Sequence, residues 1–171
     1  MRAYHIVTGR ISSVVSIDFE RETALLRFNE DLEDVDNVKN LFPSRENVPC
    51  SKLVIMNKTN SVVMCSGCNK EVELYEYDVL KIKYRDYITN EERNAFGIVA
   101  LDEVYGISLD FPQYETSISL SDDEITEIIH LGTAFDKNVI KQIKDKKLVE
   151  IIKEWKKEEV KECAKILQFS N

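Results

Sequence analysis

The chain has 171 residues, 43% hydrophobic and 32% charged, which is typical of a globular protein with enough length to bury a core. The sequence has no run close to the roughly 18 apolar residues that span a bilayer, and its N-terminal residues lack the apolar core of an export signal. We therefore expect a cytosolic protein with no membrane contact. The net charge is −8, with −11 in residues 1–135 and +3 in residues 136–171. This acidic body argues against a nucleic-acid backbone as the general partner.

The first part of the chain has the pattern of a β-hairpin followed by a short helix. Residues 14–17 and 24–28 carry strand-like apolar runs, and residues 18–23 form a plausible turn between them. From residue 31 to residue 42 the apolar positions recur at helical spacing, with Asn29 as a cap and Pro43 as the end. We therefore predict a short acidic helix in an insertion at about residues 29–51.

The middle of the chain carries many short strand signals at close spacing. Residues 53–56 and 61–64 are predicted strands around a turn at 57–60, and residues 79–84 alternate as a half-buried strand does. Further strand signals follow at 95–101, 104–109 and 128–131. Such spacing favours a small barrel or a strongly bent sheet.

The C-terminal segment, residues 136–169, has almost no helix breakers and is predicted to be helical. Its apolar spacing slips between Ile143 and Leu148, so either one helix bends or two helices follow one another. The apolar stripe around Trp155 packs on the body of the protein, or pairs with a second copy or with a host helix. These alternatives stay open at the level of the sequence.

The predicted fold is therefore α+β: a small, strongly bent β-barrel of SH3-like type with a short inserted acidic helix and a long C-terminal helix. Two regions are expected. Residues 1–135 form the β-rich domain, and residues 136–171 form the amphipathic helix.

Catalytic and metal-binding patterns are weak in this sequence. Cys65 and Cys68 form a C-x-x-C pair, but zinc requires four ligands, and the pair lies in a hairpin turn and not at a helix N-terminus. His5 and His130 are the only histidines, and the five glycines are isolated, so no phosphate-binding loop is present. We expect no enzyme activity, no cofactor and no metal.

Residues 62–82 contain an apolar run, the turn Ser66-Gly67 and the corner Leu74-Tyr75-Glu76-Tyr77-Asp78-Val79-Leu80. This order resembles the YopX-like family of bacteriophage and prophage proteins, which has a Thr-Gly turn and an I-Y-E-G-D-I-V corner. Residues 96–99 and 128–138 are similar to later blocks of the family, so the resemblance covers about residues 62–138. It implies a phage- or prophage-encoded protein and supplies no activity.

The corner departs from the family at one position, because Tyr77 stands where the family has glycine. A backbone angle that glycine adopts at no cost must therefore be relaxed or strained here. Asp78, just ahead of a strand, can accept backbone N–H bonds from the turn, and Tyr75 offers a ring to the core. We interpret Tyr75, Glu76 and Asp78 as residues that make the fold.

The leading functional hypothesis is a non-enzymatic module that binds a host or phage protein, in defence evasion or host takeover. The predicted surfaces are the Trp155 stripe and an acidic cluster that imitates a row of phosphates or simply favours a helix N-terminus. That cluster consists of Glu30, Asp31, Glu33, Asp34 and Asp36. Two alternatives are capture of a small nucleotide, and a nucleic-acid-binding small barrel that uses the lysine-rich helix together with Lys81, Lys83, Tyr84 and Arg85.

Overall fold

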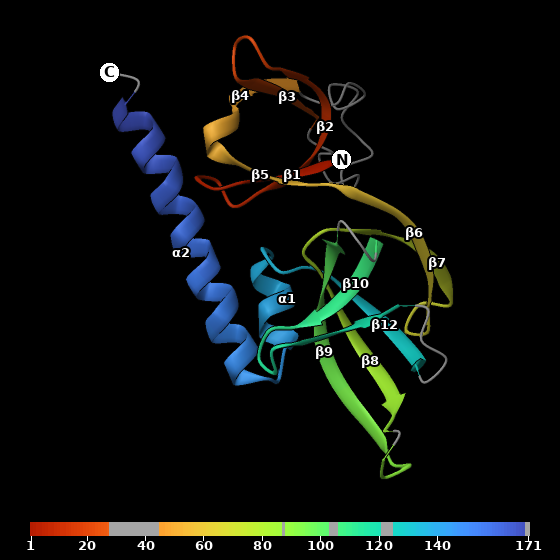
Figure 1. The fold of residues 1–171 in the computed structure, drawn as a ribbon. Coiled ribbons are helices and arrows are strands. Elements are labelled where there is room, and N and C mark those ends of the chain that lie inside the picture. Colours follow the sequence, from red (N-terminus) through yellow and green to blue (C-terminus); the bar gives the residue numbers. More distant parts are fainter. Residues whose placement is uncertain (28–44, 87, 103–105, 121–124, 170–171) are drawn as a thin grey trace, which may run out of the picture. The chain divides into compact units, whose positions relative to one another are not determined.

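The computed structural model describes residues 1–27, 45–86, 88–102, 106–120 and 125–169, with side chains as far as residue 158 (Figure 1). The chain divides into two compact units. The first unit is Met1–Met56 together with Glu158–Asn171, and the second unit is Asn57–Lys157. Each unit is described by itself.

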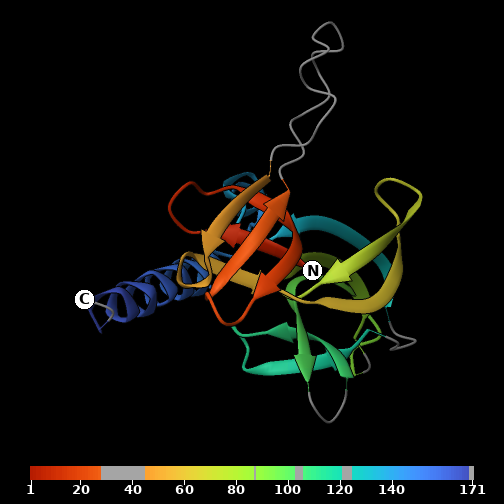
Figure 2. The same ribbon diagram turned by 90° about the horizontal axis from the view of Figure 1, so that it is seen from above.

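The first unit is built on a five-stranded antiparallel sheet in the order β4-β3-β2-β1-β5 (Figure 2). Alternate residues of its strands face one side, where Ala3, Ala24, Leu26, Val48 and Leu53 form a buried core. The bounds are β1 Arg2–His5, β2 Ile11–Asp18, β3 Thr23–Arg27, β4 Arg45–Pro49 and β5 Leu53–Met56, with a 3-10 turn at Cys50–Lys52.

The predicted hairpin between residues 53–56 and 61–64 is wrong. Strand β5 pairs with β1, and β6 (Lys58–Cys65) pairs with the strand that follows it, so the two predicted partners belong to different sheets. Asn60, expected in the turn, instead has a positive φ of 59° at a register shift within β6. A register shift of this kind uses the same residue types as a turn, which explains the error.

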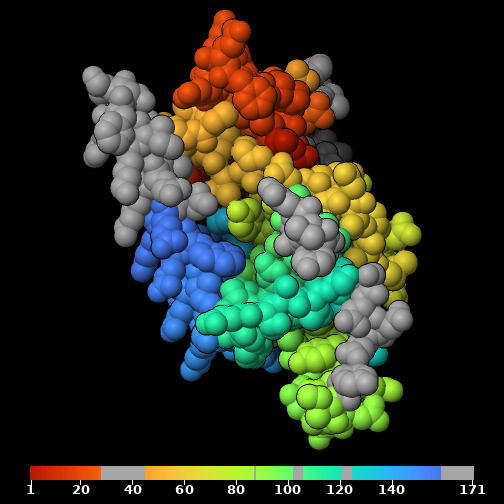
Figure 3. Space-filling view, in the orientation of Figure 1, coloured from red at the N-terminus to blue at the C-terminus, as the bar shows by residue number. Residues whose placement is uncertain are grey.

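The second unit contains a two-stranded ribbon and a five-stranded antiparallel sheet in the order β11-β10-β9-β8-β12. The ribbon pairs β6 (Lys58–Cys65) with β7 (Lys70–Tyr75). The sheet strands are β8 Asp78–Arg85, β9 Glu92–Asp102, β10 Gly106–Phe111, β11 Thr116–Ser119 and β12 Ile125–Thr133. The turn between β8 and β9, lime green in Figures 1 and 3, projects from the rest of this unit.

The five-stranded sheet of the second unit carries apolar side chains on both faces. One cluster gathers Leu80 and Ile82 of β8 with Val99, Leu109 and Phe111. The other gathers Val79 and Ile98 with residues of the two helices. Because successive side chains of a strand point to opposite faces, Val79 and Leu80 supply different clusters.

A close approach of two strands in this sheet depends on Gly97. A Cβ atom on Gly97 would lie 2.6 Å from Leu109 Cγ and 3.1 Å from the Asp110 carbonyl oxygen. Real Cβ atoms essentially never come within 2.6 Å of another heavy atom, so a larger residue here would force Leu109 to shift, and glycine lets β9 and β10 pack at this point.

The C-terminal segment forms two helices, α1 (Lys137–Gln142) and α2 (Lys146–Phe169), and not one. The Asp136 carboxylate accepts the Asn138 N–H at 2.7 Å, and the Asp145 carboxylate accepts the Leu148 N–H at 3.2 Å. Each helix thus begins at an aspartate that satisfies a free backbone donor. The break lies in the same stretch as the slip in the apolar spacing.

The predicted fold class is wrong. Among the described residues the protein is mostly β, with three antiparallel sheets, none of which closes into an SH3-like barrel. A series of short strand signals indicates β structure but does not show how the strands are grouped into sheets. Here the described strands form two five-stranded sheets and a two-stranded ribbon. The predicted acidic insertion helix lies outside the described residues.

Candidate functional site

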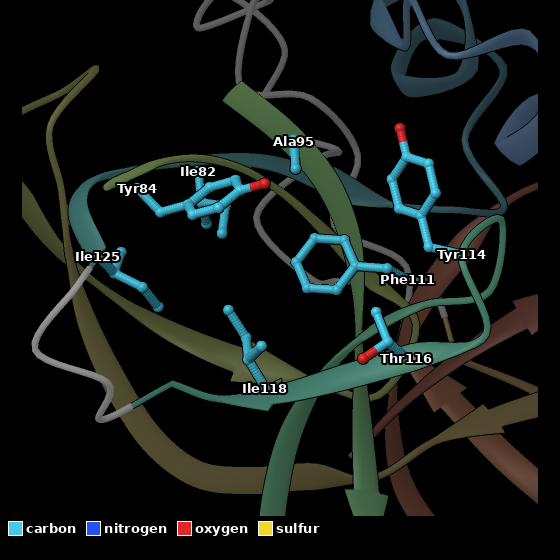
Figure 4. Close-up of a pocket in the computed structure, with 8 residues that line it drawn as sticks. All are labelled: Ile82, Tyr84, Ala95, Phe111, Tyr114, Thr116, Ile118 and Ile125. Carbon is cyan, nitrogen blue, oxygen red and sulfur yellow. The ribbon is translucent and has the colours of Figure 1, made fainter. Parts of the chain in front are cut away.

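An apolar pocket of about 160 Å³ opens on one face of the sheet in the second unit. All five strands of the sheet and the turn between β10 and β11 supply its walls (Figure 4). The lining residues are mostly aromatic and aliphatic: Ile82, Tyr84, Ala95, Phe111, Tyr114, Thr116, Ile118 and Ile125. We call it the Tyr84–Phe111 pocket.

Strand alternation and pairing explain why the pocket lies here. Ile82 and Tyr84 are two residues apart on β8, so they point to the same face. Ala95 of β9 lies directly opposite Ile82 in the ladder. Because Ala95 has only a methyl group, the space beside Ile82 stays open where a larger side chain would fill it.

The side chains of the pocket converge on this space. In Figure 4 the rings of Tyr84 and Phe111 lie on opposite sides, and Ile118 and Ile125 point into the gap between them. Phe111 is buried, whereas Tyr114 is 65% exposed, so the pocket has a fixed floor and an open rim.

The chemistry of the lining suits binding and offers little for catalysis. The polar side-chain groups in the lining are the hydroxyls of Tyr84, Tyr114 and Thr116. A general acid–base pair or an activated nucleophile requires a titratable partner within hydrogen-bond reach. The described lining contains no carboxylate, imidazole or thiol, so it presents apolar surface with a few orienting hydroxyls.

Two larger hollows lie elsewhere on the second unit. Trp155, a predicted binding residue, lines one of about 390 Å³ together with Ala100, Leu101 and Asp110. In Figure 3 the blue residues of α2 border the teal β10–β11 region. The other hollow, of about 490 Å³, lies between Lys81 and Lys144 over an apolar floor.

The helix stripe proposed for partner binding is largely occupied. Leu148 and Ile152 of α2 are buried in a cluster that includes Val79 and Ile98 of the sheet, and Trp155 packs against that cluster. This part of α2 therefore covers its own unit. The side chains of residues 159–171 lie outside the described part, as do Glu30, Asp31, Glu33, Asp34 and Asp36.

The Tyr75–Asp78 corner is a buried polar cluster. Asp78 is fully buried, and its Oδ2 accepts the Tyr75 N–H at 3.1 Å and lies 3.0 Å from His130 Nε2. Glu76 Oε2 accepts the Asn57 N–H at 3.0 Å, and the Glu76 N–H donates to the Asn57 carbonyl at 3.0 Å. The corner thus fastens β7, β8 and β12 to one another.

Tyr77 at this corner has a φ of 65°, in the left-handed region that favours glycine. Its ring lies edge-on against Phe135, with ring centroids 5.2 Å apart. Its N–H donates to the Val99 carbonyl at 2.9 Å, and its own carbonyl accepts the Ala134 N–H at 2.8 Å. Tyr77 is therefore strained, and these contacts hold it in place.

Among the β8 residues suggested for nucleic-acid binding, Tyr84 points to one face of the sheet, and Lys81, Lys83 and Arg85 point to the other, because β8 alternates. Lys83 Nζ lies 2.6 Å from Glu92 Oε2, and this ion pair raises the pKa of Lys83 and lowers that of Glu92. A lysine paired in this way offers less charge to a phosphate.

The pocket residues Ala95, Phe111, Ile118 and Ile125 were not predicted from the sequence. Ala95 lies in a predicted strand, but Phe111, Ile118 and Ile125 lie outside the predicted strands, and the pocket also depends on which strands pair. The described residues also contain no group of three His, Cys, Asp or Glu side chains arranged to hold a metal ion.

Comparisons with known protein families, with curated proteins and with solved structures find no match for this chain. Among the described residues, neither helix has the length and apolar character needed to cross a membrane.

Proposed function

We propose that the chain is a non-enzymatic protein-binding module that holds one apolar side chain of its partner in the Tyr84–Phe111 pocket. The observation that carries the proposal is the pocket itself: an aromatic-walled cavity whose floor is buried and whose rim is exposed. Binding sites between proteins concentrate their energy in such anchor pockets.

The volume of the pocket selects the kind of ligand. Pockets for drug-sized ligands and cofactors measure roughly 300–1,000 Å³. The cavity here measures about 160 Å³, close to the roughly 150 Å³ of an apolar cavity that holds one benzene ring. A single aromatic or branched aliphatic side chain fits this space, and a nucleotide does not.

The polarity of the pocket selects the same ligand. Its walls carry no charged group, so a phosphate or a carboxylate would lose its hydration there with no compensating partner. The hydroxyls of Tyr84, Tyr114 and Thr116 suit the peptide groups that flank a buried anchor residue. We therefore expect a peptide segment with one aromatic residue.

The biological setting of the proposal rests on the resemblance of residues 62–138 to YopX-like phage and prophage proteins. On that basis the protein acts in the cytosol of a bacterial host, on a host or phage protein, in defence evasion or host takeover. The genes that flank its own gene test this setting directly. A neighbourhood of bacterial housekeeping genes would refute it.

The pocket is tested by selecting peptides from a displayed random library on the immobilised full-length protein. We expect the selected peptides to share one aromatic residue, and truncation of that residue to alanine to weaken binding at least about thirtyfold, as for an anchor worth about 2 kcal/mol. Isothermal titration of synthetic peptides measures the affinities.

Two matched variants on β9 separate the pocket from the Trp155 hollow. Ala95→Leu places an isopropyl group in the Tyr84–Phe111 pocket, whereas Ala100→Leu makes the same change beside Trp155. We expect Ala95→Leu to abolish peptide binding and Ala100→Leu to retain it, with urea unfolding confirming that both variants fold. Loss with Ala100→Leu alone would assign binding to the Trp155 hollow, and retention by both would refute the proposal.

A further inference from the structure

Cys65 and Cys68 lie in the turn that joins β6 to β7. Cys65 is the last residue of β6, and the Asn69 N–H donates to the Cys65 carbonyl at 2.9 Å, which closes the turn. Asn69 has a φ of 52°, a conformation that asparagine tolerates better than most residues. The turn therefore fixes both cysteines in one short loop.

This turn is fastened to strand β12. The Ser66 N–H donates to the Ile128 carbonyl at 2.8 Å. Gly67 lies against Ile129, and a Cβ atom on Gly67 would lie 3.3 Å from Ile129 Cγ2 and 3.8 Å from Cys65 Sγ. The Cys65 sulfur is thus held between the turn and β12.

The surroundings of the Cys65 sulfur favour a thiolate. The backbone N–H of His130 is the largest influence and lowers the pKa of Cys65. The backbone N–H groups of Cys68 and Gly67 and the Cys68 side chain lower the pKa of Cys65 as well, and together these influences outweigh burial, which raises it. The Cys68 thiol itself lies 4.0 Å from the Cys65 carbonyl oxygen, to which it donates. Donors that converge on one sulfur stabilise its anion.

The two thiols differ in access. Cys65 is 3% exposed, whereas Cys68 is exposed at the surface. A buried, hydrogen-bonded sulfur beside an accessible one is the arrangement expected of a dithiol in which one sulfur meets the reactant and the other resolves the intermediate. A structural zinc site needs four ligands, and no group of three suitable side chains occurs in the described part of the chain.

We propose that Cys65 and Cys68 form a redox site that exchanges with low-molecular-weight disulfides such as oxidised glutathione. The Cys68 sulfur attacks one sulfur of the small disulfide, the S–S bond breaks, and the first small thiolate leaves with the proton of Cys68. The Cys65 sulfur then attacks Cys68 Sγ and displaces the second small thiolate, which takes the proton of Cys65. The protein dithiol is oxidised by two electrons, and the small disulfide is reduced to two thiols.

The hydrogen bonds at Cys65 set the direction of the equilibrium. They stabilise the thiolate of the reduced form and weaken when the sulfur is in a disulfide, so Cys65 is a good leaving group when an external thiol attacks Cys68. The disulfide is therefore readily reduced, which makes the pair reversible and distinct from a structural crosslink.

The test incubates the full-length protein with oxidised glutathione, quenches it by alkylation and maps the peptide that contains both cysteines by mass spectrometry. We expect a peptide that has lost two hydrogens and carries no glutathione, and that returns to the dithiol on addition of reduced glutathione. Cys50→Ser, a matched removal of a thiol outside the pair, is expected to behave like the wild type. Cys68→Ser is expected to keep the Cys65 thiol unoxidised.

Four results would overturn the proposal: a persistent glutathione adduct on Cys68, a disulfide between two chains, an unreactive pair, or a purified protein whose pair holds a thiophilic metal ion. Because Cys68 is exposed, Cys68→Ser is expected to unfold in urea like the wild type. If it does not, Cys68→Ala replaces it in the same assay.

Discussion

Replacing the buried Asp78 by alanine is expected to destabilise the second unit by about 2–4 kcal/mol. The substitution removes the oxygen that accepts the Tyr75 N–H at 3.1 Å and lies 3.0 Å from His130 Nε2. Both groups remain in place, in a region that gives water little access, since Asp78 is fully buried and the His130 side chain is only 16% exposed.

The magnitude follows from the two groups that lose their partner. A buried backbone donor without an acceptor costs about 1–3 kcal/mol, which applies to the Tyr75 N–H. His130 is partly accessible, so water replaces some of its lost bond and its share is about 1 kcal/mol. Asp78→Asn keeps one oxygen and the same shape, so its cost is expected to be about 1 kcal/mol.

The assay is urea unfolding followed by the fluorescence of Trp155, the only tryptophan of the chain, which packs against the core of the second unit. A double-mutant cycle with Asp78→Ala and His130→Ala isolates the energy that the two side chains share. We expect a coupling energy of about 1 kcal/mol, because contacting polar pairs couple by roughly 0.5–3 kcal/mol. A loss below about 0.5 kcal/mol for Asp78→Ala, typical of surface substitutions, would refute the reasoning.

Two further perturbations address strain and burial in the second unit. Tyr77→Gly relieves the positive φ of 65°, worth about 1–2 kcal/mol, but loses the packing on Phe135, so we expect a net loss of about 1 kcal/mol in urea unfolding. A stabilised variant would show that the ring packing contributes less than the strain costs. Burial lowers the pKa of Lys156 below its ordinary 10.5, with Asp136 opposing and Lys137 reinforcing this shift. The charged form of Lys156 therefore costs stability at neutral pH. The stability of the wild type relative to Lys156→Met is expected to rise as the pH is raised from neutral towards the ordinary lysine pKa of 10.5, and a flat difference would contradict this.

Some of the structure follows from local sequence pattern alone. The alternation of residues 79–84 predicts a half-buried strand, and β8 spans Asp78–Arg85. The slip in apolar spacing between Ile143 and Leu148 indicates a change in the C-terminal helix, and α1 ends at Gln142 before α2 begins at Lys146. In both cases the signal lies within a few residues of the feature.

Pairing between distant segments could not be predicted in the same way. Asp78 and His130 are 52 residues apart, and the sequence around either residue does not indicate that it contacts the other. Strand β5 pairs with β1 across about fifty residues, whereas the residues beside it suggest a hairpin. The prediction of a closed barrel was wrong for the same reason, because strand signals in a sequence do not specify which strands pair at the edges of a sheet.

The candidate site likewise combines features that local sequence patterns predict with features that depend on pairing between distant segments. Ile82, Tyr84 and Ala95 of the Tyr84–Phe111 pocket lie in strands that the sequence predicts, whereas Phe111, Tyr114, Thr116, Ile118 and Ile125 lie outside the predicted strands. The cavity itself arises because the small Ala95 faces Ile82 across the ladder and β11 brings Ile118 to the same space. The acidic cluster, by contrast, was prominent in the sequence and lies outside the described residues.

The most direct test of the binding account is an NMR spectrum of the protein, labelled at its isoleucine methyl groups, in complex with a selected peptide. We predict intermolecular NOEs from one aromatic ring of the peptide to the methyl groups of Ile82, Ile118 and Ile125, which line the pocket. The absence of NOEs from the peptide to these three isoleucines under saturating peptide would contradict the account.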